Sequence, residues 1–144
     1  WGLAAIRLGM AFASMEIIDL LNKIKSPYNL NILTIDFVLR QLDFLKKKND
    51  SVDILVKERQ LLMEHFKSFT FINKVNRSDA NFILIQVDDA DGLYQFLVSK
   101  GIIVRNRSNM PLCEGGLRIT VGTTLENNNL LASMSEWASL KSLS

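Results

Sequence analysis

The feature that most constrains the fold is an almost continuously apolar run at residues 3–13, which Arg7 alone interrupts with a charge. Such density is typical of a strand that is covered on both faces, as in a parallel sheet. We therefore expect a buried strand at about residues 8–13. A lone buried strand needs a sheet, yet no other segment is an evident parallel partner. This pattern indicates the end of a larger α/β domain.

Helical patterns occupy the next fifty residues. Ser14 is a suitable N-cap for a short helix that ends before Ser26-Pro27. A longer pattern runs from about residue 31 to residue 48, and Asn49-Asp50-Ser51 is expected to break it. A further helix carries the apolar positions Leu55, Leu62 and Phe66.

Strands and helices alternate from residue 69 onward. The expected strands are residues 69–75, 81–87, 102–104 and 117–121. The first two are separated by the turn-forming residues 76–79, so we expect them to pair as a hairpin. One helix is expected from Asp88-Asp89 to Lys100-Gly101, and the capping box Thr123-x-x-Glu126 opens the last helix. The back half is therefore predicted to be an α+β unit with a four-stranded sheet.

Composition excludes several classes of function. The net charge of +2 arises from 17 basic and 15 acidic residues scattered along the 144-residue chain, which argues against binding to nucleic acid or to a membrane surface. No run approaches the roughly 18 apolar residues of a membrane span. The single cysteine, Cys113, permits no internal disulfide and no paired-cysteine metal site, and it fits a cytoplasmic protein.

Other chemically suggestive residues have plain structural explanations. The run Lys46-Lys47-Lys48 ends an apolar-periodic segment, where cations complement the helix dipole, so a phosphate-binding patch is the lesser alternative. His65, the one histidine, has no neighbour that indicates a triad or a metal site. Cys113 has no histidine near it in the sequence, and Gly115-Gly116 forms no dinucleotide-binding pattern.

Arg7 is the first candidate anion ligand. It lies between Ile6 and Leu8, where a guanidinium must find an anion or bear a large desolvation penalty. The sequence leaves two interpretations open: a phosphate ligand, or an arginine that reaches out to solvent or pairs with a buried carboxylate.

A second candidate site involves two later arginines. Arg118 and Thr120 share one face of the strand expected at residues 117–121, whose other face is apolar. Arg105 directly follows the strand expected at residues 102–104. If these strands are neighbours, the two arginines can converge on one doubly charged anion, since each offers paired donors. The alternative is that both are surface arginines with solvated heads.

Longer motifs carry a resemblance to a known family. Residues 1–13, WGLAAIRLGMAFA, resemble the segment that follows the cofactor-binding lysine in fold-type-I pyridoxal-phosphate aminotransferases. Further similarities run in the same order: residues 27–31 to P-P-Y-N-V-N, 81–82 to A-N-F, 101–107 to G-I-I-V-R-x-R, and 117–123 to L-R-I-T-V-G-T. The chain thus resembles the C-terminal portion of the histidinol-phosphate aminotransferases. Met10 and Ala5 depart from the usual tyrosine and glycine of the first motif.

The resemblance implies an α/β fold in two parts. Residues 1–35 would be a remnant of the large cofactor-binding domain, contributing one strand and one helix, and residues 36–144 would form the small α+β domain. The Schiff-base lysine of the family would lie two residues before Trp1, and none of the chain's ten lysines stands in the matching context. The chain therefore contains no expected catalytic residue, and by itself we expect it to be inactive.

The resemblance also implies an activity for the parent protein. It would transfer an amino group between L-histidinol phosphate and 2-oxoglutarate in histidine biosynthesis, as a cytoplasmic homodimer with pyridoxal 5'-phosphate as cofactor. Arg7 would bind the cofactor phosphate, while Arg105 and Arg118 would bind the substrate. No metal, nucleic acid or membrane partner is implied. Two alternatives remain: a threonine-phosphate decarboxylase-like enzyme, or a non-catalytic α+β binding or assembly module.

Overall fold

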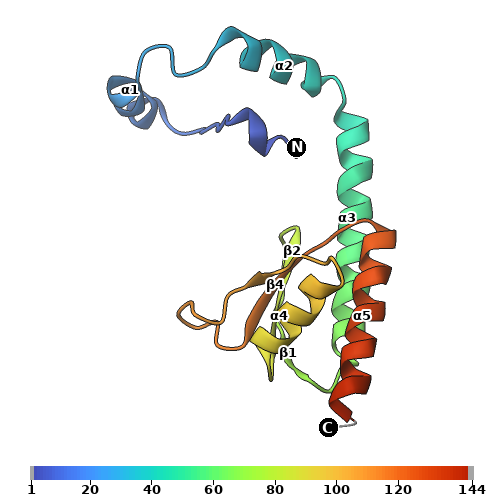
Figure 1. The fold of residues 1–144 in the computed structure, drawn as a ribbon. Helices are drawn as coiled ribbons and strands as arrows, with labels where there is room; N and C mark the ends of the chain where they lie inside the picture. Colours follow the sequence, from blue (N-terminus) through green and yellow to red (C-terminus); the bar gives the residue numbers. More distant parts are fainter. Residues whose placement is uncertain (1, 143–144) are drawn as a thin grey trace. The chain divides into compact units, whose positions relative to one another are not determined.

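The computed structural model describes residues 2–142, which divide into two compact units (Figure 1). The first unit comprises residues 1–50 and the second residues 51–144, so the boundary falls within helix α3 (Leu45–Phe66). The domain boundary predicted after residue 35 stays a prediction. Across residues 2–142, no helix combines the length and the apolar character needed to cross a bilayer.

The first unit contains short helices that expose much of their apolar surface. A 3₁₀ turn, η1 (Ala4–Ile6), precedes α1 (Met15–Ile24) and α2 (Ile32–Leu42). Helix α1 begins after Ser14 as expected, although the Ser14 side chain forms no cap hydrogen bond. Asn31 caps α2 by accepting a hydrogen bond from the Thr34 N–H at 2.8 Å.

The buried strand expected at residues 8–13 is not formed. These residues have no regular secondary structure, and all but Leu8 are exposed; the Phe12 side chain is 92% exposed. A strand is stable only when its N–H and C=O groups pair with a neighbouring strand. Within residues 2–142 the sheet consists of four strands of the second unit, and none of them pairs with residues 8–13.

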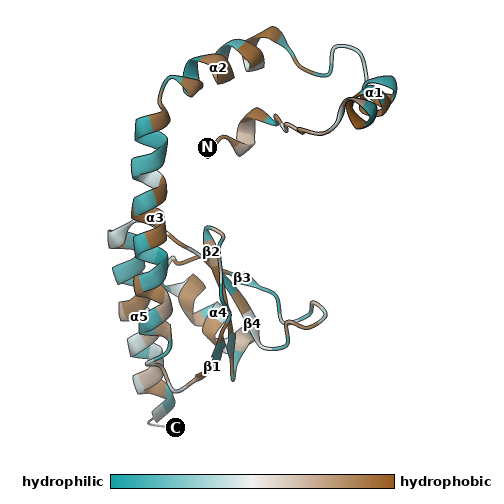
Figure 2. Cartoon of the chain, turned by 180° about the vertical axis from the view of Figure 1, so that it is seen from behind, coloured by the Kyte–Doolittle hydropathy of each residue, from teal (hydrophilic) through white to brown (hydrophobic). Residues whose placement is uncertain are grey.

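The break expected at residues 49–51 was also wrong. The helix ends earlier, where Asp43 and Phe44 donate to carbonyls three residues back, at 3.4 and 3.0 Å. Helix α3 then runs through Asn49, Asp50 and Ser51, which are all exposed. Figure 2 colours most of these first turns hydrophilic. Polar side chains with weak helix propensity cost under about 1 kcal/mol each when they reach water, so the helix continues.

The second unit has the predicted four-stranded sheet. Its strands β1 (Ile72–Val75), β2 (Phe82–Val87), β3 (Arg105–Asn106) and β4 (Gly116–Thr120) lie in the order β1-β2-β4-β3, and every neighbouring pair is antiparallel. The predicted hairpin is confirmed, because β1 pairs with β2. Helices α4 (Ala90–Ser99) and α5 (Thr124–Ser142) complete the unit.

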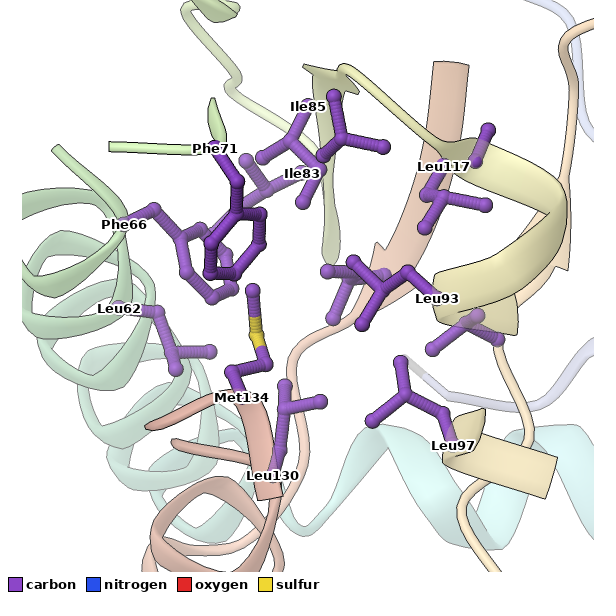
Figure 3. Close-up of a cluster of buried hydrophobic side chains, with 14 of the residues drawn as sticks. Leu62, Phe66, Phe71, Ile83, Ile85, Leu93, Leu97, Leu117, Leu130 and Met134 are labelled. Carbon is purple, nitrogen blue, oxygen red and sulfur yellow. The ribbon is translucent and has the colours of Figure 1, made fainter. Parts of the chain in front are cut away.

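One face of this sheet is packed against helices. Figure 3 shows the buried side chains of α3, α4 and α5 directed toward those of the strands, with Met134 pointing toward Phe66 and Phe71. The sheet contributes Ile83, Ile85, Leu117 and Ile119, and the helices contribute Leu62, Phe66, Leu93, Leu97, Leu130 and Met134. Because side chains alternate along a strand, the residues between these point to the sheet's other face.

The end of α4 explains why β3 begins later than expected. Gly101 adopts a left-handed conformation with φ of 77° and donates to the Val98 carbonyl, while Ile102 donates to the Leu97 carbonyl, each at 2.9 Å. These two bonds form a Schellman motif. The Ile102 N–H is thereby used by the helix, and the chain joins the sheet only at Arg105. The strand predicted at residues 102–104 was therefore wrong.

Replacement of Gly101 by alanine should destabilise the second unit by about 1 kcal/mol, because the left-handed conformation is costly for a residue with a Cβ. A Cβ at this position meets no atom within 4 Å, so the loss of stability would come from the backbone conformation and not from a steric clash. Urea unfolding followed by circular dichroism measures it. Gly101→Asn is the matched control, since asparagine tolerates this conformation better, and equal losses for both variants would contradict the explanation.

Candidate functional site

Arg118 lies on the sheet face that no helix of the core covers. In β4 it alternates with the fully buried Leu117 and Ile119, so its side chain points away from the core. Its direct partner in β2 is Leu84. The strand's alternation predicted this placement, and the side chain is partly buried rather than freely solvated.

Arg105 is directly opposite Arg118 in the pairing of β3 with β4. The sequence left open whether the segment at Arg105 neighbours β4; in the structure β3 does so, and the arginine pair, Arg105 and Arg118, lies on one face. Like charges directly opposite each other destabilise a sheet. Within residues 2–142 neither guanidinium forms an ion pair with a carboxylate. A bound anion would relieve this repulsion.

The short strand β3 is anchored by Asn106. The Asn106 Nδ2 donates to Asp91 of α4 at 2.5 Å, and its Oδ1 accepts from the Ser108 N–H and hydroxyl at 2.9 and 2.6 Å. The Arg107 N–H also donates to the Gly116 carbonyl at 2.7 Å. These bonds hold the backbone beside Arg105 although the strand has two residues. Sequence reasoning missed Asn106; its contact with Asp91 of α4 lies 15 residues away, although the nearby Ser108 was an available signal for a local turn.

The Arg118 guanidinium rests on an aromatic ring. Its Cζ lies 5.1 Å from the centroid of the Phe82 ring. Its Nε is buried and has no hydrogen-bond partner. Sequence reasoning noted Phe82 as a strand start but missed this contact; the alternation of β2, which places Phe82 and Leu84 on one face, was the available signal.

Arg7 lies in the other unit. It follows η1, has a left-handed backbone with φ of 58°, and is exposed. Among residues 2–142 no carboxylate forms an ion pair with it. A guanidinium that is open to ligands and has no carboxylate partner is suited to a phosphate group. The two units are not placed relative to each other, so the structure does not bring Arg7 together with the arginine pair.

The carboxylates with shifted pKa values have structural roles. Glu58 on α3 accepts hydrogen bonds from Thr124 and Asn127 of α5, each at 2.7 Å, and these bonds lower its pKa. The pKa of Glu126 is lowered by the Thr123 N–H and hydroxyl, which confirms the predicted capping box. The pKa of Asp89, the N-cap of α4, is lowered by Lys141 and by the Gly92 N–H.

His65 and Cys113 have no contact in residues 2–142 that indicates a catalytic role. His65 donates from Nδ1 to the Leu61 carbonyl at 2.8 Å, one helical turn back. Cys113 is a partly buried free thiol. A groove of about 780 Å³ opens between residues 100–104 and the start of α5, and none of the three candidate arginines lines it. In the arginine pair, Arg105 is exposed and Arg118 is partly buried.

Comparison with known proteins identifies the class. The family profile described as "Aminotransferase class I and II" matches residues 1–134, nearly the whole chain. The chain therefore belongs to the class I and II aminotransferase family. A solved structure described as a putative aminotransferase from Burkholderia pseudomallei has a TM-score of 0.86 and 25% identity, over 95% of this chain and 42% of that one. This agreement confirms the fold predicted from the motifs.

Two curated relatives are named more specifically. The histidinol-phosphate aminotransferase of Parabacteroides distasonis is 51% identical over 134 residues, which are 93% of this chain and 39% of that protein. The histidinol-phosphate aminotransferase of Flavobacterium psychrophilum is 47% identical over 91% of this chain and 38% of that protein. The chain thus spans about two fifths of the length of the curated relatives it matches.

Proposed function

We propose that this chain is part of a histidinol-phosphate aminotransferase, which transfers an amino group between L-histidinol phosphate and 2-oxoglutarate in histidine biosynthesis. The single observation that carries the proposal is the arginine pair: Arg105 and Arg118 are directly opposite each other in the sheet, and neither forms an ion pair with a carboxylate within residues 2–142. The identity of 51% and 47% to relatives of that name supports the choice of substrate.

The arginine pair suits both substrates. Histidinol phosphate carries a phosphate dianion, and 2-oxoglutarate carries a carboxylate at each end. A guanidinium presents paired N–H donors that match the oxygens of either group. We propose that Arg105 and Arg118 bind the phosphate of the amino donor in one half-reaction and a carboxylate of the oxoacid in the other, so that one cationic site serves both.

Arg7 would hold the phosphate of pyridoxal 5'-phosphate. Arg7 is exposed and forms no ion pair within residues 2–142, which fits that group. When bound, this cofactor supplies the electron sink for amino transfer. The role of Arg7 is to anchor the phosphate end through charge-assisted hydrogen bonds, which would bind and orient the cofactor without taking part in proton transfer.

The test is an assay of the full-length protein. Incubation with L-histidinol phosphate and 2-oxoglutarate should form glutamate at a kcat within roughly 1–10³ s⁻¹, the usual range for enzymes. Carbon dioxide release from threonine phosphate without glutamate formation would favour a decarboxylase instead. Absence of turnover with either substrate, together with a specific protein partner, would favour a binding module.

The 144-residue chain provides the matched control. It should form no glutamate under the same conditions, since none of its ten lysines stands in the family's cofactor-binding context. Measurable turnover by the chain alone would contradict this assignment. We also propose that the full-length protein is a cytoplasmic homodimer, and light scattering on the purified protein measures the oligomeric state.

A further inference from the structure

Within residues 2–142 no hydrogen bond holds the Arg118 guanidinium in place. Its Nε is buried without a partner, and within residues 2–142 no ion pair involves this side chain. An arginine side chain has several rotatable bonds and is mobile unless its head is fixed. The contact recorded for this head is with the Phe82 ring, at 5.1 Å from the Cζ to the centroid.

The sheet register brings ring and cation together. Leu84 of β2 is directly opposite Arg118 of β4, and Phe82 precedes Leu84 by two residues on the same face. Diagonal neighbours on one face of an antiparallel pair are within reach of aromatic and long side chains. The contact is therefore built by strand pairing and not by a mobile loop.

Phe82 has no evident role in the core. It is partly buried, and it is absent from the cluster of buried and partly buried apolar residues that packs between the sheet and the helices. A large aromatic side chain on the face without helices needs another explanation. A cation over the face of an aromatic ring is attracted by the ring's quadrupole, which fixes the cation near the ring.

We propose that Phe82 is a positioning residue for Arg118, whose ring holds the guanidinium so that its two Nη groups remain available to an anionic substrate. The inference deepens the proposed function and rests on it. Because the Nε of Arg118 is buried, only its Nη groups can donate to an anion, so the direction in which the guanidinium points decides whether it can bind the substrate. Removal of the ring would free the cation to adopt orientations that do not match the substrate.

Kinetics of the full-length enzyme test this role. Phe82→Leu should raise KM for both histidinol phosphate and 2-oxoglutarate by roughly 3- to 30-fold, the range of a cation–π contact, with kcat within about threefold of the parent. Phe82→Tyr retains the ring and should keep KM within about twofold. Phe69→Leu is the matched control, since Phe69 is also partly buried and contacts the Phe71 ring instead of a cation.

The outcomes separate a positioning role from a structural one. If Phe82→Tyr raises KM as much as Phe82→Leu, or if Phe69→Leu does so, the inference is overturned. If Phe82→Leu does not fold, Phe82→Ile offers the same removal of the ring with a side chain favoured in strands. A fall in kcat without a change in KM for any ring-deleting variant also counts against the proposal.

A double-mutant cycle distinguishes this inference from the proposed function. In the Arg118→Ala background the substitution Phe82→Leu should have no further effect on kcat/KM, because the cation it orients is absent. If Arg118→Ala abolishes turnover while Phe82→Leu leaves KM unchanged, the inference about Phe82 fails and the proposed function stands. If neither substitution affects turnover of histidinol phosphate, both the inference about Phe82 and the proposed role of the arginine pair fail.

Discussion

Replacement of Arg118 by alanine in the full-length enzyme should lower kcat/KM for histidinol phosphate by roughly 10²- to 10³-fold. The substitution removes a charge-assisted, forked donor that faces Arg105 across the β3–β4 pair. Such contacts to an anion are about twice as strong as neutral hydrogen bonds, and a loss of roughly 3–4 kcal/mol corresponds to this fold-change. Steady-state kinetics with both substrates measure it, and unchanged turnover would contradict the proposed role of Arg118 in substrate binding.

Two further variants sharpen this result. Arg118→Lys keeps the charge but loses the planar fork, so its activity should lie between that of the parent and that of Arg118→Ala. Arg77→Ala removes the same charge from the exposed loop between β1 and β2. Its kcat/KM should stay within about threefold of the parent value, since long-range charge effects at the surface are screened by salt. An equal loss of kcat/KM for Arg77→Ala would show that the effect comes from the net charge of the protein and not from the position of Arg118.

The second large effect concerns stability. Phe66→Ala should destabilise the second unit by about 3–5 kcal/mol, because it leaves a cavity between α3, α5 and the sheet. The Phe66 side chain is fully buried, and Figure 3 shows it beside Phe71 and facing Met134. A loss of this size is a large part of the stability of a small domain, about 5–15 kcal/mol. Urea unfolding followed by the fluorescence of Trp137, which packs against Phe96 of α4, measures the change.

Leu61→Ala is the matched control for this experiment. Leu61 lies on the same helix, but its side chain is 46% exposed. Its removal should cost about 1 kcal/mol or less, since much of the side chain stays in contact with water in the folded state. Similar losses for Leu61→Ala and Phe66→Ala would mean that α3 does not pack as described.

Local sequence signals predicted much of the second unit. The capping box at Thr123 and Glu126, the glycine end of α4 at Gly101 and the β1–β2 hairpin all formed as expected. Helix caps and hairpin turns are stabilised by residues within a few positions of one another, so a short stretch of sequence is enough to predict them. The error at residues 8–13 has a long-range cause, because a strand there would need a partner from elsewhere in the fold. The errors at residues 49–51 and 102–104 have local causes, the continuation of α3 and the Schellman motif at Gly101.

The sequence by itself determined which residues face away from the core, since the alternation of β4 is enough to place Arg118 there. It also determined the family, through motifs that cover most of the chain. Only the tertiary structure decided that Arg105 lies opposite Arg118 and that Phe82 lies beside it. Those contacts depend on strand order and register, which arise from packing the whole sheet against α3, α4 and α5. No local pattern within one strand specifies the residue on its neighbour.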